Sequence, residues 1–301
     1  MLTLLVAASV LAWHPQLIMQ QPPARGPSCD HRRSAIVVAV ETEQQQQRVA
    51  EAMEIKPVAE TSARSVGLAL ALDDGTRKSH SLAENTAFVT GFFRGIAKKE
   101  AFAQLVTSLY FVYEAMERAF DETTDPAVKA LDYSSLRRLA SLEKDMAYFH
   151  GDGWRASVKP TAATAAYVQR IEEVARESPC LLVAHQYTRY LGDLFGGQMM
   201  GGMARRSLGL DPGRGTEFYT FDEVADAKSF IEEWYSSLNE LDLTDDQRQA
   251  IVDEGNLVFT LNIGIFDELE GGKRAVVGAV WTLAKDAFKR ALGLGPKRDA
   301  N

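Results

Sequence analysis

A carboxylate inside a glycine-rich helical stretch is the first feature of this chain that could do chemistry. The stretch covers residues 180–210, where apolar side chains recur at every third or fourth position. Each glycine in a helix interior costs roughly 1 kcal/mol relative to alanine. Five glycines therefore cost about 5 kcal/mol, which is comparable with the net stability of a domain. The carboxylate is Asp193, and the glycines are Gly192, Gly196, Gly197, Gly201 and Gly202.

Two physical reasons for these glycines remain open. Glycine lets a helix bend, and it lets a flat group approach the backbone where a Cβ would clash. Gly192 and Gly196 are four residues apart and share a face, and Asp193 lies next to that face. The pattern predicts either a planar ligand beside a proton-transferring carboxylate, or a thin helix that packs closely on a neighbour.

A histidine and a glutamate form the second candidate group. His80 is followed four residues later by Glu84, which could orient the imidazole as iron-ligating histidines require. The alternative is a structural histidine at a helix end. His185 is expected to pack or to form hydrogen bonds. One candidate ligand and one glycine-rich helix could together hold a haem between them.

Composition and charge limit the classes of function. Hydrophobic residues make up 46% of the 301 residues, and no Val, Ile or Thr runs alternate with period two, so we expect an all-α fold with a sizeable core. The whole chain has a net charge of −8 and residues 1–40 carry +2, so the remainder carries −10. This acidity argues against a nucleic-acid partner. No apolar run reaches the ~18–20 residues that span a bilayer.

The N-terminal region has the composition of a targeting sequence. Residues 1–13 are apolar like a secretory signal, and residues 14–40 are rich in proline and arginine like a transit peptide. We therefore expect residues 1–47 to be the two-part leader of a plastid protein. An ordinary secretory signal or a disordered tail are the alternatives. A linker is expected at 48–57 and a folded domain at 58–271.

Helical periodicity continues through the expected domain. One helical stretch covers 60–80 but is interrupted at 73–75 by two aspartates and a glycine, and His80 closes it. Further helices are predicted over 98–121, 160–178 with Pro160 in its first turn, and 221–241. The last predicted helix of the domain follows Thr244, whose spacing to Gln247 is that of a capping box, and runs to Leu269.

A separate basic segment follows at 272–301. Its helix over 273–292 has an apolar side and several lysines and arginines, on an otherwise acidic protein. It could contact an anionic membrane surface peripherally or dock an acidic partner. It could equally pack on the body with a solvated charged face.

The chain resembles the haem oxygenases over about residues 65–270. The resemblance rests on four motifs in order, and the form of the first is closest to the cyanobacterial and plastid branch. They are GTRKSHSLAEN (75–85), LYFVYEAME (109–117), LLVAHQYTRYLGDLFGGQ (181–198) and LVFTLNIGIFDEL (257–269).

The resemblance implies a single all-helical domain that binds haem between a proximal and a distal helix. His80 matches the iron ligand, Glu84 matches its hydrogen-bonding partner, and Asp193 matches the carboxylate of a distal water network. Other matches are the glycines against the haem face (Gly192, Gly196, Gly197), polar network residues (Tyr113, Arg189, Asn262) and pocket walls (Tyr187, Phe259).

Several positions depart from the family. Basic residues that usually meet the haem propionates are replaced by Asp73, seven residues before His80, and by Ile231 and Tyr235 on a later helix. Charge-assisted contacts are worth about 1.5–3 kcal/mol each, so their loss predicts weaker haem binding or a changed in-plane rotation. A usual small serine is Phe195 here, which is expected to alter oxygen access or ligand position.

Two functions remain open from the sequence. The first is an active plastid haem oxygenase that uses O₂ and reductant to open haem to biliverdin, with release of CO and Fe(II). The branch implies ferredoxin as the electron donor, and a bilin reductase is a further candidate partner. The second is a non-catalytic protein of this fold, such as a haem or bilin carrier or a subunit of a larger assembly.

Overall fold

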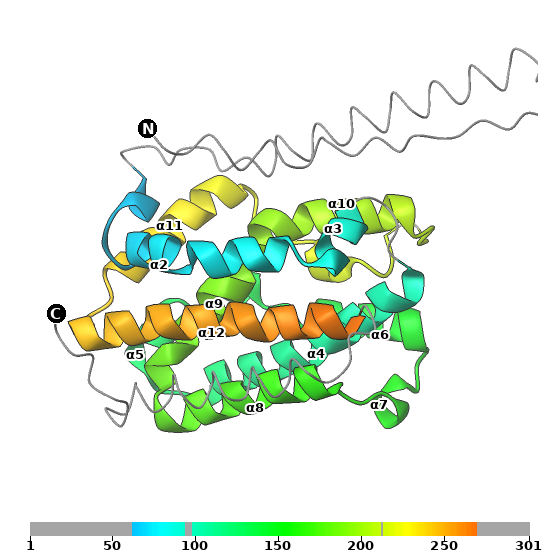
Figure 1. The fold of residues 1–301 in the computed structure, drawn as a ribbon, viewed down its shortest axis with the longest axis horizontal. Coiled ribbons are helices and arrows are strands. Elements are labelled where there is room, and N and C mark those ends of the chain that lie inside the picture. The colour runs from blue at the N-terminus through cyan, green and yellow to red at the C-terminus, as the bar shows by residue number, and fades with distance from the viewer. Residues whose placement is uncertain (1–61, 94–97, 212, 270–301) are drawn as a thin grey trace, which may run out of the picture. The chain divides into compact units, whose positions relative to one another are not determined.

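All regular structure in the part of the chain that the structure describes is helical (Figure 1). The structure is a computed structural model that describes residues 62–93, 98–211 and 213–269. The absence of strands from these residues confirms the all-α prediction. None of the described helices is long and apolar enough to cross a membrane. The four longest helices are α2 (Gly67–Glu84), α4 (Lys99–Glu122), α8 (Ala162–Glu177) and α12 (Asp245–Leu269).

Shorter helices and turns connect the long helices. The α-helical ones are α3 (Ala87–Phe93), α5 (Pro126–Ala130), α6 (Leu139–His150), α7 (Trp154–Ser157), α9 (Leu182–Gln186), α10 (Gln198–Ser207) and α11 (Ala227–Asn239). The 3₁₀ turns are η1 (Ala63–Ser65), η2 (Ser134–Leu136), η3 (Pro179–Leu181) and η6 (Glu217–Tyr219). The π-helical segments are η4 (Tyr187–Leu191) and η5 (Asp193–Gly197).

Helix α2 runs without a break through the predicted interruption at 73–75, so that prediction was wrong. Gly75 is not a helix stop, because its bare backbone lies against α12, where a Cβ would stand 2.4 Å from Cγ1 of Val252. Asn256 on α12 donates to the Gly75 carbonyl at 3.0 Å and accepts from the Ser79 hydroxyl at 2.6 Å. Close packing therefore overrides the low helix propensity, and His80 lies one turn inside the helix end.

Helix α12 is also fixed to α8 by buried charge. Arg170 on α8 donates from Nε and Nη2 to the two carboxylate oxygens of Glu254 at 3.0 and 2.6 Å. His185 on α9 lies 3.2 Å from the same carboxylate, which confirms its predicted role in hydrogen bonding. Burial raises the pKa of Glu254, but the bonds from His185 and Arg170 outweigh burial and lower it. The carboxylate therefore stays ionised and ties three helices together.

Two predicted helix starts are wrong and one is confirmed. Pro160 lies before α8, whose N-cap is Thr161, because the threonine hydroxyl accepts from a backbone N–H in the first turn. Helix α11 begins after Asp226 rather than at 221, because the Asp226 carboxylate caps it. The capping box at Thr244 forms as predicted, with reciprocal bonds to Gln247 of 3.2 and 2.9 Å. Residues 1–47, the linker at 48–57 and the basic segment at 272–301 lie outside the described residues.

A buried carboxylate holds the turn that follows α10. Asp145 on α6 is fully buried and accepts from the backbone N–H groups of Glu217 and Phe218, each at 2.9 Å. Burial raises the pKa of Asp145 to about 6, although both hydrogen bonds lower it. The turn that it holds carries Tyr219, which covers part of the glycine-rich helix.

Asp145→Asn should change how stability depends on pH. Between pH ~4 and ~6 folded Asp145 binds more protons than the unfolded group, so the free energy of unfolding falls as pH rises through this window. The variant cannot titrate at this position, so its stability relative to wild type should improve by about 2–3 kcal/mol from pH 4 to pH 7. Urea unfolding at several pH values measures this, and two parallel pH profiles would contradict it.

Candidate active site

The glycine-rich stretch is helical as predicted, but its centre is wound as a π-helix. Helix α9 passes directly into η4 and η5, and α10 resumes at Gln198 and ends at Ser207. A π-helix has i→i+5 hydrogen bonds, is rare, and occurs frequently at functional sites. The wider winding shifts the side chains of 187–197 away from the α-helical register, and it changes which of them face the neighbouring helices.

Four of the predicted site residues meet in one buried network. The Arg189 guanidinium donates from Nη2 to Asp193 Oδ2 at 2.9 Å and from Nη1 to Asn262 Oδ1 at 2.7 Å. Tyr113 donates its hydroxyl to Asp193 Oδ2. Tyr113 and Asn262 are each less than 9% exposed, and 10% of the Arg189 side chain and 14% of the Asp193 side chain remain accessible. Both charged groups of the network therefore lie close to an accessible surface.

Opposing influences act on the Asp193 carboxyl. Burial raises its pKa above the ordinary value, while Arg189 and the Tyr113 hydroxyl lower it, and the net shift is upward. The same surroundings raise the pKa of Tyr113, first through burial and then through the charge of Asp193. Tyr113 therefore stays protonated and acts as a donor. A carboxyl with a raised pKa is suited to pass protons, because its two protonation states are closer in free energy.

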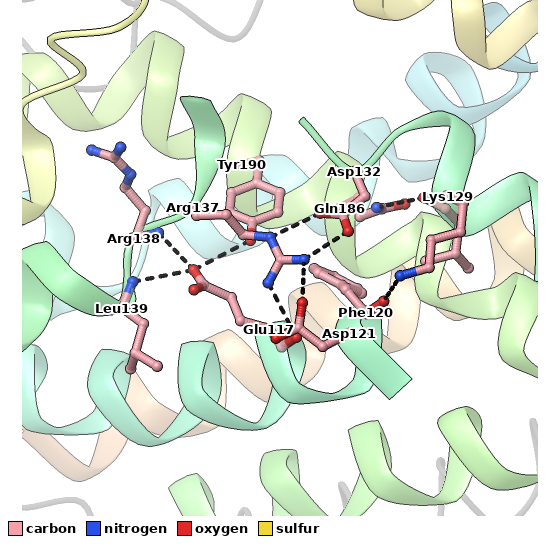
Figure 2. Close-up of polar contacts among 11 residues, drawn as sticks. Glu117, Phe120, Asp121, Lys129, Asp132, Arg137, Arg138, Leu139, Gln186 and Tyr190 are labelled. Carbon is pink, nitrogen blue, oxygen red and sulfur yellow. Dashed lines mark hydrogen bonds and ion pairs between the residues drawn. The ribbon is translucent and has the colours of Figure 1, made fainter. Parts of the chain in front are cut away.

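Helix α4 holds the π-helix at two points, one turn apart. Tyr113 reaches Asp193, and Glu117 accepts a hydrogen bond from the Tyr190 hydroxyl at 3.3 Å. Figure 2 shows that the same Glu117 carboxylate also accepts from the backbone N–H groups of Arg138 and Leu139, at 2.6 and 3.1 Å. Glu117 thus satisfies the start of α6 and fixes the π-helix with one buried group. Its pKa is raised, principally by burial.

The glycines of the stretch divide into two groups with different surroundings. A Cβ added at Gly192 or Gly196 would meet no other atom within 4 Å. A Cβ at Gly197 would stand 3.0 Å from the Tyr219 ring, and one at Gly201 would stand 2.7 Å from Tyr219 Cβ. The close packing that the sequence left open is therefore present at two of the glycines, and the other two leave room for a ligand. Gly197 and Gly201 allow close packing, while Gly192 and Gly196 form an open face next to Asp193.

His80 and Glu84 form a second group on α2. Imidazole Nε2 of His80 lies 3.4 Å from Glu84 Oε1, and about half of each side chain is exposed. The His80 ring contacts the Phe259 ring of α12 with centroids 5.3 Å apart. Because imidazole has two nitrogens, the approach of one to Glu84 leaves the other for a metal ion. Among the described residues no group of three or more His, Cys, Asp or Glu side chains is placed to hold a metal ion.

Helix α12 contacts both groups. Phe259, which contacts His80, and Asn262, which bonds Arg189, are three residues apart and therefore adjacent on the helix surface. The His80 pair and the Asp193 network are thus placed by neighbouring positions of one helix. No hydrogen bond or ring contact in the described part of the chain joins the two groups directly.

Tyr187 lies apart from both groups, at the start of the π-helix. Burial raises its pKa, the charge of Asp73 raises it further, and a hydrogen bond with Thr76 of α2 lowers it.

Of the positions that depart from the family, Asp73 is paired with Arg64 and Tyr235 is buried. Phe195 has 75% of its surface exposed, the largest exposure of any large apolar residue in the described part of the chain.

Three residues that shape the site could not be recognised from the sequence. Tyr219 covers two of the glycines from a separate turn, and Glu117 anchors the π-helix. Tyr167 of α8 is fully buried, and burial raises the pKa of its phenol. Glu117 lies within a family motif, and that was the only available signal for any of the three.

Comparison with known proteins matches this arrangement. A family model described as heme oxygenase fits residues 66–268. The heme oxygenase of the red alga Porphyra purpurea is 45% identical over 203 residues, which are 67% of this chain and 86% of that protein.

Two solved structures of cyanobacterial enzymes have the same fold. Heme oxygenase-1 of Synechocystis, in complex with heme, has a TM-score of 0.66 at 41% identity and covers 74% of this chain and 100% of that one. Heme oxygenase-2 of the same organism, in complex with heme and NO, has a TM-score of 0.67 at 36% identity, with coverages of 73% and 93%.

The fold and site define an all-helical protein with a glycine-faced π-helix and an accessible histidine, His80, on helix α2. The matches cover most of the chain and nearly all of the relatives. The chain therefore belongs to the haem oxygenase family, in its cyanobacterial and plastid branch, and its function is that of a haem-degrading enzyme.

The division of the glycines predicts opposite effects of alanine on stability. Gly196→Ala should stabilise the haem-free protein by about 0.5–1 kcal/mol, because the added methyl group meets open space. Gly201→Ala should destabilise it by about 1–3 kcal/mol, because Tyr219 must move. Thermal or urea unfolding measures both.

Gly202→Ala is the matched control. Its added Cβ would lie 3.9 Å from the Arg206 guanidinium, so this variant should behave like Gly196→Ala. A loss of stability at Gly196 as large as that at Gly201 would show that the face at Gly196 is covered by protein.

Proposed function

We propose that this haem oxygenase opens haem to biliverdin with release of CO and Fe(II), in a plastid, with electrons from ferredoxin. A bilin reductase would then consume the product. The plastid assignment is supported by the two-part composition of residues 1–47 and by relatives in red algae and cyanobacteria. The main support for the reaction is the open face at Gly192 and Gly196 directly beside the Asp193 network.

The described residues fit a haem. A porphyrin needs a face without side chains, which Gly192 and Gly196 supply. The porphyrin also supplies four nitrogen ligands to its iron, so a single protein histidine such as His80 is sufficient. Structural relatives of this chain were solved in complex with heme. We therefore assign His80 as the axial ligand, with Tyr187 and Phe259 as pocket walls.

The pair of His80 and Glu84 orients this ligand. A carboxylate that accepts from the second imidazole nitrogen fixes the tautomer and the ring orientation, and it raises the basicity of the nitrogen that ligates iron. Both side chains are half-exposed in the described structure, at 49% and 43%. A bound haem that covers the two side chains would strengthen their interaction, since burial strengthens a charge-assisted hydrogen bond.

The bound haem supplies the iron that binds and activates O₂, and the distal residues manage protons. Arg189 holds the Asp193 carboxylate in place and offsets the cost of burying its charge. Tyr113 donates to Oδ2, so Oδ1 carries only the bond from Arg189 at 3.2 Å among the described residues. Oδ1 is therefore the oxygen best able to exchange a proton with a water on the glycine face. Asn262 fixes the far side of Arg189.

His80→Ala should remove the axial ligand. The haem complex should lose the Soret spectrum of a histidine-ligated iron, and added imidazole should restore it by filling the vacated space. Absorbance spectra of the ferric complexes measure this. His150→Ala, which changes a histidine that contacts Thr107 on α4, serves as the control and should leave the spectrum unchanged. An unaltered spectrum in His80→Ala would exclude His80 as the ligand.

Asp193→Asn should leave haem bound but slow ring opening by roughly 10²–10⁴-fold, the range typical of proton-transfer groups. Asparagine keeps the size of the side chain and an acceptor oxygen for Arg189 and Tyr113, so the hydrogen-bonded arrangement should survive at a cost in stability from the unpaired Arg189 charge. Haem affinity and turnover with ascorbate in air, followed as conversion of the Soret band to bilin absorption, measure the two effects separately. Turnover at the wild-type rate would remove Asp193 from the reaction.

A further inference from the structure

An arginine from outside the recognised motifs lies at the Tyr187 end of the site. Arg64 belongs to η1, the turn before α2, and donates from Nε to Asp73 Oδ1 at 3.1 Å, with a second bond from Nη2 to the same oxygen. Its charge also acts on the phenols of Tyr187 and Tyr235. Four side chains from η1, α2, η4 and α11 thus form one group, which we call the Arg64 cluster.

The turn that carries Arg64 is held firmly on α11. Glu232 accepts from the Ser62 hydroxyl at 2.7 Å and from the Ala63 N–H at 2.9 Å. Asn239 donates to the Ala63 carbonyl at 2.7 Å and accepts from the Ala69 N–H at 2.9 Å. These bonds join residues about 170 positions apart and fix the backbone on both sides of Arg64. The position of the guanidinium is therefore a built feature of the fold.

Gly67 completes this attachment. Its φ is +59°, and a Cβ there would stand 2.6 Å from Asn239 Oδ1. Glycine is thus needed both for the left-handed backbone and for the approach of Asn239. The chain turns at this point from η1 into α2, which brings Arg64 back along the first turns of the helix to Asp73.

A donor and part of the surface of Arg64 remain available to a further anion. Asp73 is 17% exposed and accepts from Arg64, while Arg77 is shared between Asp73, at 3.4 Å, and Asp74. One third of the Arg64 side chain is exposed. The bonds to Asp73 use Nε and Nη2, and Nη1 makes no hydrogen bond to another described residue. Arginine presents its donors as a planar fork that matches a carboxylate.

Haem carries two propionate carboxylates at one edge, and the usual cations are missing at Asp73, Ile231 and Tyr235. We propose that Arg64 binds a haem propionate and that Asp73 holds the guanidinium in place for it. The chain has thereby moved this cation from the helices to the turn before α2. The inference rests on the proposed binding of haem to this site. Tyr187, which belongs to the Arg64 cluster, links it to the π-helix that faces the porphyrin.

Substitutions in an Asp73→Asn background test this assignment without leaving an unpaired acid beside the porphyrin. We expect the Arg64→Ala/Asp73→Asn chain to bind haem roughly tenfold more weakly than the Asp73→Asn chain, in line with the loss of one charge-assisted hydrogen-bonded contact. Absorbance titration of the full-length chains measures the affinity. Haem dimethyl ester, in which both carboxylates are blocked, should bind equally to the two chains.

Arg77→Ala in the same background is the matched control. Arg77 also contacts Asp73, but its side chain is 60% exposed, and its removal should leave haem affinity unchanged. If Arg64→Ala weakened the binding of haem and of the ester equally, Arg64 would act only through packing, and the proposal would be wrong. Unchanged haem binding in the same variant would contradict it as well. If the wild-type chain bound neither porphyrin, the proposed function and this inference would fail together. If it bound haem independently of Arg64, this inference alone would fail.

Discussion

The site depends on one buried ion pair, between Arg189 and Asp193. Two charges removed from water are tolerated only when their geometry is good and their remaining hydrogen bonds are satisfied. Arg189 meets most of this requirement by bonding Asp193 on its own helix and Asn262 on α12, while Tyr113 reaches Asp193 from α4. The buried Nε of Arg189 has no hydrogen-bond partner among the described residues. The pair therefore fixes the π-helix between two long helices, and the loss of either partner would leave an unpaired buried charge.

This constraint explains how a costly glycine-rich helix persists. Side chains on the faces that contact α4 and α12 hold the π-helix in place. Side chains are therefore not required on its other side. Gly192 and Gly196 use that freedom to leave a face open, while Gly197 and Gly201 accept the Tyr219 ring. The same segment thus has a packed side that stabilises it and a bare side for the substrate. Asp193 lies between them, partly accessible and next to the open face.

Much of the fold could be predicted from the sequence, because helical periodicity is a local property. The spacing of apolar residues predicted α4, α12 and the helical nature of 180–210. The π winding could not be predicted, because it depends on contacts from Tyr113 and Asn262, more than 70 residues away. Local signals also misled at 73–75, where two acids and a glycine indicate a helix stop. There, tight packing of Gly75 on Val252 decides the structure.

Only those residues of the candidate site that lie within the sequence motifs were predicted. Tyr113, Arg189, Asp193 and Asn262 were each expected in a polar network, and the structure brings them together. Arg64 carried no signal, because no motif surrounds it and because Glu232 and Asn239, which hold its turn through Ser62 and Ala63, are far away in sequence. The sequence alone therefore indicated that propionate cations were missing, whereas the fold shows which cation lies close to two of the vacated positions.

A crystal structure of the full-length chain with ferric haem would test the account most directly. The account predicts iron bonded to His80, with the porphyrin lying over Gly192 and Gly196 and the Asp193 carboxylate on the side of the porphyrin away from His80. Iron bound to another residue, or a porphyrin that leaves those two glycines uncovered, would contradict it.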